Sequence, residues 1–180
     1  GHGDHGGRAM TSSTMPETLH RLVRRLDAAL TAPVETLGNA VTAALGEAVV
    51  SNDWLNAEQQ RASHDHYTRH ILYADPQNCY TVVAIAWGSG QRSPIHGHHT
   101  WCGVAIYSGE VNETFYEIDT HGSAQRPTRT VRRTAGTLSF DADLAGAHRI
   151  VNDAQDVAIS IHVYGVGAAR IATDVNRIVG

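Results

Sequence analysis

The sequence has little cysteine, no long apolar run and no excess of positive charge. Its two cysteines, Cys79 and Cys102, are too few for a disulfide framework, and with no signal peptide ahead of them a reducing cytoplasm is expected. The longest apolar stretches, such as 81–87, are strand-sized, well short of the roughly 20 residues of a membrane-spanning helix. Lys and Arg total 14 against 18 Asp and Glu, and the net charge of −4 provides no basic surface for a phosphate backbone. The composition therefore argues against membrane and nucleic-acid partners.

The organisation of the chain changes once, near residue 67. At 180 residues and 42% hydrophobic content, a single globular domain is expected. Residues 1–13 form a leader, either flexible or left over from expression, and residues 14–66 are predicted to be helical and to pack on the remainder of the domain. The apolar stripe of the second helix is expected to be Val34, Leu37, Val41, Ala44, Leu45 and Ala48, with a short third helix near 56–62.

Residues 67–180 consist of short β-rich runs separated by turn residues such as Gly109 and Gly136. The expected strands are 67–73, 80–87, 101–107, 111–118, 128–133, 137–140, 148–152 and 157–164. Many short strands with no helices between them indicate an antiparallel sandwich or barrel. The predicted fold is therefore mainly β, a barrel with helices at its N-terminal end.

Histidine is the unusual component of the composition, with 12 residues. His96 and His98 are two positions apart, so on one strand both side chains point to the same face, where a barrel has its interior. Gly97 between them keeps the other face free of a bulky side chain, and His99 points away. The two imidazoles can therefore share a metal ion. The histidines at 64, 66 and 70 are expected to be solvated or packed rather than ligands.

The spacing around this pair resembles the first cupin motif, Gly-x5-His-x-His-x3-Glu-x6-Gly, from Gly90 to Gly109, with Cys102 in place of the glutamate. His148 followed by Asn152 resembles the end of the second cupin motif, although its Pro-x-Gly element is missing. The resemblance implies a cupin barrel, a double-stranded β-helix of jelly-roll type. A same-face pair plus a third histidine predicts a metal site at His96, His98 and His148.

Three neutral imidazoles without a carboxylate leave a divalent ion its full charge and several open coordination positions. That arrangement suits an anionic thiolate with room for dioxygen. The same ligands can hold zinc with an activated water, so the ligand types leave iron and zinc both open.

Four local motifs are similar to the cysteine dioxygenases and, more broadly, to the cupin-type thiol dioxygenases. They span residues 67–164 and comprise Tyr67-Thr68-Arg69, the segment from Trp87 to His98, His148-Arg149, and the alternating Ser160, His162 and Tyr164. The resemblance implies one iron(II) per chain and oxidation of a small thiol to its sulfinate with both atoms of O2, the chain being a monomer or small homo-oligomer. It also implies roles for these residues: metal ligands His96, His98 and His148; catalytic Tyr164, His162 and Ser160; substrate-binding Arg69 and Tyr67.

Several alternatives remain open at this point. The resemblance favours L-cysteine as the thiol, because cysteine-type enzymes carry an arginine at the position of Arg69 and 3-mercaptopropionate-type enzymes usually carry a glutamine. A guanidinium at this position can grip the carboxylate of the substrate bidentately. The segment 164–170 resembles enzymes of 3-mercaptopropionate, and Arg170 as a second anion contact would suit mercaptosuccinate. From another class, a non-oxidative zinc or nickel cupin or a small-ligand sensor fits the metal motif alone. A thioether between Cys102 and Tyr164, as in eukaryotic members of the family, is a further hypothesis; the alternative is that Cys102 is a small buried hydrophobe.

Overall fold

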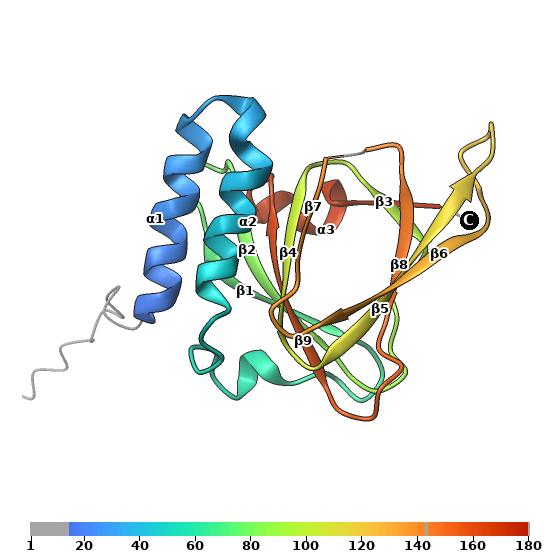
Figure 1. Ribbon diagram of the computed structural model, residues 1–180, viewed down its shortest axis with the longest axis horizontal. Helices are drawn as coiled ribbons and strands as arrows, with labels where there is room; N and C mark the ends of the chain where they lie inside the picture. The colour runs from blue at the N-terminus through green and yellow to red at the C-terminus, as the bar shows by residue number, and fades with distance from the viewer. Residues whose placement is uncertain (1–14, 143, 180) are drawn as a thin grey trace, which may run out of the picture.

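Two antiparallel five-stranded sheets face each other and form a barrel, with two helices against one side (Figure 1). The computed structural model describes residues 15–142 and 144–179. The predicted leader, residues 1–13, lies outside the described residues. The mainly β fold with N-terminal helices is as the sequence predicts.

The first sheet, called sheet A, has the strand order β1-β2-β9-β4-β7. Its strands are β1 (Thr68–Ala74), β2 (Thr81–Trp87), β9 (Ala158–Tyr164), β4 (Cys102–Ser108) and β7 (Leu138–Asp141). The second, sheet B, has the order β10-β3-β8-β5-β6. Its strands are β10 (Asn176–Ile178), β3 (His96–His98), β8 (Ala147–Val151), β5 (Glu110–Ile118) and β6 (Ala124–Thr134).

The helices α1 (Glu17–Thr31) and α2 (Leu37–Ala48) cover the outer face of sheet A (Figure 1). Leu22 and Leu26 of α1 share a buried apolar cluster with Val82 and Ala84 of β2. The alternate residues Val83 and Ile85 join a second cluster inside the barrel, together with residues of β4, β5 and β9. Both faces of β2 and β9 are therefore buried, which explains why these strands are apolar at nearly every position.

The remaining helical segments are short: the 3-10 turns Val34–Thr36, Glu58–Gln60 and Ala168–Arg170, and the one-turn helix α3 (Ile171–Asp174). In residues 15–142 and 144–179, no helix combines the length and the apolar character needed to cross a membrane.

All eight predicted strands form, and their ends differ from the prediction by at most one residue, except for β6, which begins earlier, at Ala124. Two helical expectations are wrong in detail. Val34 is 80% exposed, because the 3-10 turn that precedes α2 directs it away from the sheet. The expected helix near 56–62 is only the 3-10 turn Glu58–Gln60. The strand β3 was not among these eight and was expected only from the spacing of His96 and His98, and the strand β10 was missed altogether.

Candidate metal centre

Three imidazoles from two neighbouring strands converge inside the barrel. His96 and His98 lie on β3, and His148 lies on β8 directly opposite His96 in the antiparallel register. The ring centroids are 5.2 Å (His96–His98), 4.5 Å (His96–His148) and 4.8 Å (His98–His148) apart. The Nε2 atoms of His98 and His148 are 3.4 Å apart, a separation at which both can lie the ~2.1 Å of a metal–nitrogen bond from one ion. The three side chains fit a metal ion.

The outer nitrogen of each ring is held by an acceptor. Nδ1 of His96 donates to the carbonyl of Pro94 at 2.8 Å. Nδ1 of His98 lies 3.3 Å from a carboxylate oxygen of Asp141. Nδ1 of His148 donates to Glu113 at 2.9 Å. A proton on Nδ1 leaves the lone pair on Nε2, so the three acceptors select the tautomers that can bind a metal.

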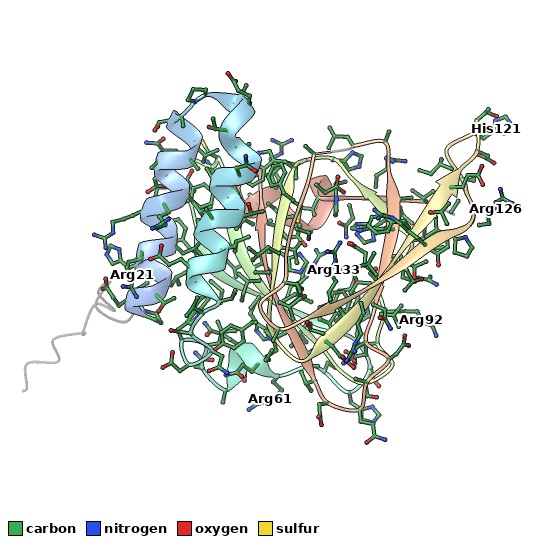
Figure 2. The ribbon with its side chains drawn as sticks, viewed as in Figure 1. Arg21, Arg61, Arg92, His121, Arg126 and Arg133 are labelled. Carbon is green, nitrogen blue, oxygen red and sulfur yellow. The ribbon has the colours of Figure 1, made fainter. Side chains whose placement is uncertain are left out.

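Burial and neighbouring groups set the protonation states of His96 and Glu113. Burial, reinforced by His148, lowers the pKa of His96 to about 3, so this ring is neutral, the form that binds metals. Burial alone would raise the pKa of Glu113. Hydrogen bonds from His148 and from Arg133, the latter at 2.7 Å, outweigh burial and lower this pKa, so Glu113 is a carboxylate. Arg133 is labelled in Figure 2, where it lies on the barrel part of the molecule.

The histidines line a small pocket that takes the rest of its wall from sheet A and from β10. Its cavity volume is about 30 Å³, so the pocket suits a small ligand. Tyr67 and Arg69 stand at the start of β1, and the ring of Tyr67 packs on Trp87 with centroids 4.4 Å apart. Nε of Arg69 is buried and has no hydrogen-bond partner. A donor of a positively charged side chain that lines the pocket is therefore left without a protein acceptor.

A row of hydrogen-bonded side chains crosses the inner face of sheet A. Nε1 of Trp87 donates to the hydroxyl of Ser160 at 2.9 Å, and this hydroxyl lies 2.7 Å from Nε2 of His162. Nδ1 of His162 lies 3.2 Å from the phenolic oxygen of Tyr164. Because Ser160 already accepts from Trp87, its own proton is best placed on the bond to His162, which puts the ring proton on Nδ1, facing Tyr164.

The two titratable side chains of this row, His162 and Tyr164, are neutral. Burial, with a contribution from Arg69, lowers the pKa of His162 to about 3. Burial raises the pKa of Tyr164 far above its usual range. Tyr164 accepts from His162 and keeps its own proton, which is then available to a ligand in the pocket.

Comparison with known proteins agrees with this geometry. A protein-family model described as cysteine dioxygenase type I matches residues 9–172. The chain belongs to the cysteine dioxygenase type I family. Membership supports a cupin thiol dioxygenase in general, acting on a thiol and O2, and the cluster of His96, His98 and His148 supports a bound metal ion.

Solved structures with similar folds are distant in sequence. An uncharacterized conserved protein with a double-stranded β-helix domain from Klebsiella pneumoniae has a TM-score of 0.50 and 16% identity, over 72% of this chain and 93% of that chain. TT1209 from Thermus thermophilus has a TM-score of 0.48 and 16% identity, over 62% and 95%. A cupin 2 conserved barrel domain protein from Rhodopseudomonas palustris has a TM-score of 0.48 and 20% identity, over 62% of this chain and 66% of that chain. At these identities the likeness concerns the fold alone, and the structure from Klebsiella pneumoniae supports a double-stranded β-helix.

In this member of the cysteine dioxygenase family, Cys102 lies directly opposite Tyr164 in the register of β4 and β9. It is a free thiol, 2% exposed, with its sulfur 3.9 Å from Nδ1 of His162. Burial raises the pKa of the thiol well above its usual value, so it is protonated. The position where cupins carry a glutamate thus presents a neutral sulfur to the pocket.

The structure brings nearly all of the predicted site residues into one pocket. The residues that line it are Tyr67, Arg69, His96, His98, Cys102, His148, His162 and Tyr164, while Ser160 supports His162 from behind. Arg170, considered as a second anion contact, is exposed and does not line the pocket. His99, His64 and His66 are exposed, as expected.

Residues of the site that were missed from the sequence include Glu113, Asp141 and Asn176. Glu113 alternates with Val111 and Phe115 along β5, and a carboxylate in such an apolar row was a usable signal of an interior partner. Asn176 lies on the short strand β10, which carries no alternating pattern.

Proposed function

We propose that the protein is an iron(II)-dependent dioxygenase that converts L-cysteine to its sulfinate. In this reaction R–SH and O2 give R–SO2H: both oxygen atoms become bonded to sulfur, which loses four electrons, and dioxygen gains four. The observation that carries the proposal is that three imidazoles open onto the same small pocket as Arg69, whose buried Nε has no protein partner.

The metal ligands are proposed to be His96, His98 and His148. With Cys102 in place of a glutamate, no carboxylate reduces the charge of the bound ion. When bound, iron(II) supplies a Lewis acid for the thiolate and the means to activate dioxygen. Glu113 and Pro94 hold the outer nitrogens of His148 and His96, so the ligand set is oriented before the metal arrives.

Arg69 is proposed to bind the carboxylate of the substrate. Its Nε is a donor that the protein leaves unused, and a charge-assisted bond from a guanidinium to a carboxylate is among the stronger hydrogen bonds. Tyr67 lines the pocket beside it. A substrate fixed at its carboxylate has few orientations left, and the small pocket directs its thiol toward the three histidines.

The row of Ser160, His162 and Tyr164 is proposed to act as a fixed proton donor. Trp87 and Ser160 set the tautomer of His162, and Nδ1–H of His162 then donates a hydrogen bond to the phenolic oxygen of Tyr164. The hydroxyl proton of Tyr164 is therefore directed at the pocket, available to the oxygen atoms that are being transferred.

The test is oxygen uptake by purified protein loaded either with iron(II) or with zinc. The panel contains L-cysteine, 3-mercaptopropionate and mercaptosuccinate, and the product is identified by mass spectrometry. Iron-loaded protein should consume one O2 per L-cysteine and release the sulfinate, whereas zinc-loaded protein should consume none. Metal binding without oxygen uptake for any thiol would support a non-oxidative cupin. Faster turnover of either other thiol would overturn the choice of cysteine.

A further inference from the structure

The barrel contains a second cavity, distinct from the pocket into which the three histidines open. Its volume is about 340 Å³, and residues of β5, β6, β7 and β8 line it. β6 and β7 are edge strands of sheets B and A, so the cavity lies where neither sheet continues. His148 lines both cavities, and its Nδ1 bonds to Glu113, a residue of the second one. The second cavity therefore lies behind the metal ligands.

Arg129 is the exception among the arginines of β6. The other three each pair with a glutamate of β5: Arg126 with Glu117, Arg132 with Glu110 and Arg133 with Glu113. Arg129 lies opposite Phe115 in the register, and its guanidinium carbon is 4.2 Å from the centroid of that ring. In the described part of the chain, no carboxylate forms an ion pair with Arg129. Its charge and its N–H donors are therefore available to a ligand.

Arg133 faces the same cavity as Arg129. The two are four residues apart on one strand, so their side chains project to the same face, and both line the cavity. Arg133 lies opposite Val111, which belongs to the apolar cluster inside the barrel, so this face is the interior one. Arg133 donates to Glu113 at 2.7 Å. A guanidinium has five N–H donors, so this bond leaves Arg133 able to contact a ligand as well.

The opposite wall of the cavity adds a hydroxyl group. Ser139 and Asp141 of β7 line the cavity, whereas the alternate residues Leu138 and Phe140 pack with the cluster that includes the helices. Among the residues that the structure describes, none forms a hydrogen bond with the hydroxyl of Ser139. The cavity therefore has an unused donor on β7 as well as on β6.

The two carboxylates of the cavity are turned toward the metal ligands. Glu113 accepts from His148 and from Arg133. Asp141 lies 3.3 Å from Nδ1 of His98. The groups that remain for a ligand are thus the positive charge of Arg129 and the donors around it.

We propose that this cavity is a second ligand site and that it binds a small oxyanion, such as a carboxylate, a sulfate or a phosphate. Arg129 provides the unpaired charge, and Arg133 and Ser139 provide further donors from two strands. Hydrogen bonds from a guanidinium to an oxyanion are charge-assisted and are among the stronger ones in proteins. The site requires neither a metal nor a thiol, so it does not depend on the proposed function.

The experiment follows the full-length, ¹⁵N-labelled and zinc-loaded protein by NMR during titration with sulfate or acetate at constant ionic strength. The Nε–H signal of Arg129, assigned from the variant that lacks it, reports directly on the guanidinium. The site variants are Arg129→Gln, which removes the charge, and Ser139→Ala, which removes the hydroxyl. Arg132→Gln is the matched control, because Arg132 is on the same strand but on its outer face, paired with Glu110. Arg69→Ala is the control for the pocket of the three histidines.

The Nε–H signal of Arg129 should shift along a saturable one-site curve for at least one of the two anions. The anion that binds more tightly shows whether the natural ligand carries a tetrahedral oxyanion or a carboxylate. Arg129→Gln should raise the dissociation constant about tenfold, and Ser139→Ala about threefold, as expected for loss of a charged and of a neutral hydrogen bond. Arg132→Gln and Arg69→Ala should change it by less than about twofold, because charges outside the site are screened by salt.

A shift without saturation, or equal weakening by Arg129→Gln and Arg132→Gln, would show only a general attraction to basic side chains and would overturn the site. Weakening by Arg69→Ala alone would place the anion in the pocket of the three histidines and would also overturn it. The backbone signals of interior residues such as Val111 verify that each variant is folded, so a loss of binding is not a loss of structure.

Discussion

The carboxylate of Glu113 accepts a hydrogen bond from Nδ1 of His148 at 2.9 Å and is itself held by Arg133 at 2.7 Å. Glu113 and His148 are 35 positions apart in the sequence but are diagonal neighbours across β5 and β8, where Glu113 pairs with Ile150 and His148 pairs with Phe115. A carboxylate at this place fixes the ring orientation of a metal-binding histidine and raises its basicity. The strength of the metal site therefore depends on a residue that does not touch the metal.

Glu113→Gln should lower the affinity for iron(II) by about 10- to 100-fold, because the amide removes the negative charge that supports His148. Competition with a coloured chelator measures this directly. Glu117→Gln is the control: Glu117 is on the same strand but pairs with Arg126 at the exposed end of the β5–β6 hairpin (Figure 2). If both variants retain the original affinity, Glu113 is only a packing residue.

Arg69→Ala should raise the dissociation constant for L-cysteine by about 10- to 100-fold, the range expected for a hydrogen bond to a charged group. Iron content should not change, because Arg69 does not bond to any of the three histidines. Arg61→Ala, at an exposed arginine paired with Glu58, should change neither quantity. A parallel loss of iron and substrate in Arg69→Ala would mean that this side chain is structural.

Ser160→Ala should lower kcat by about tenfold with little change in KM, since the tautomer of His162 is no longer fixed. It should also lower the free energy of unfolding by about 1–3 kcal/mol, because Trp87 and His162 lose a buried partner. Trp87→Phe keeps the bond between Ser160 and His162 and should retain more activity. Denaturant unfolding and steady-state kinetics separate the two effects. An unchanged kcat in Ser160→Ala would show that the hydrogen-bonded row of Ser160, His162 and Tyr164 takes no part in the reaction.

Cys102 and Tyr164 are opposite each other on neighbouring strands, which allows a thioether between them. Formation of this bond removes one hydrogen from each residue, with dioxygen as the oxidant. After turnover with cysteine in air, a tryptic digest should contain residues 93–129 joined to residues 150–170, lighter than the sum of the two peptides by two hydrogen atoms. Cys102→Ser should give the two peptides separately. Two unmodified peptides from the original protein would contradict the cross-link.

Local patterns predicted most of the fold. The strands were found because apolar and polar residues alternate between clear turn residues, and the pair of His96 and His98 was found because a spacing of two places side chains on one face. The placement of Val34 was wrong because a helical spacing does not show where a helix begins, and the preceding 3-10 turn changes the direction of this side chain.

The rest of the site depends on contacts between distant parts of the chain. No local pattern pairs Glu113 with His148 or shows that the acceptor of Trp87 is Ser160, 73 residues away. Asn176 is placed by three residues of pairing between β10 and β3, too few to leave a period in the sequence. These relationships follow from the closure of the barrel.

The most direct test of the account is the origin of the oxygen atoms in the product. Iron(II)-loaded protein is given L-cysteine under ¹⁸O2 in ordinary water, and the sulfinate is analysed by mass spectrometry. If His96, His98 and His148 hold an iron that performs dioxygenation, the product carries two ¹⁸O atoms, and a variant in which His148 is replaced by alanine gives none. A product with one labelled atom, or cystine as the only oxidised species, would contradict the account.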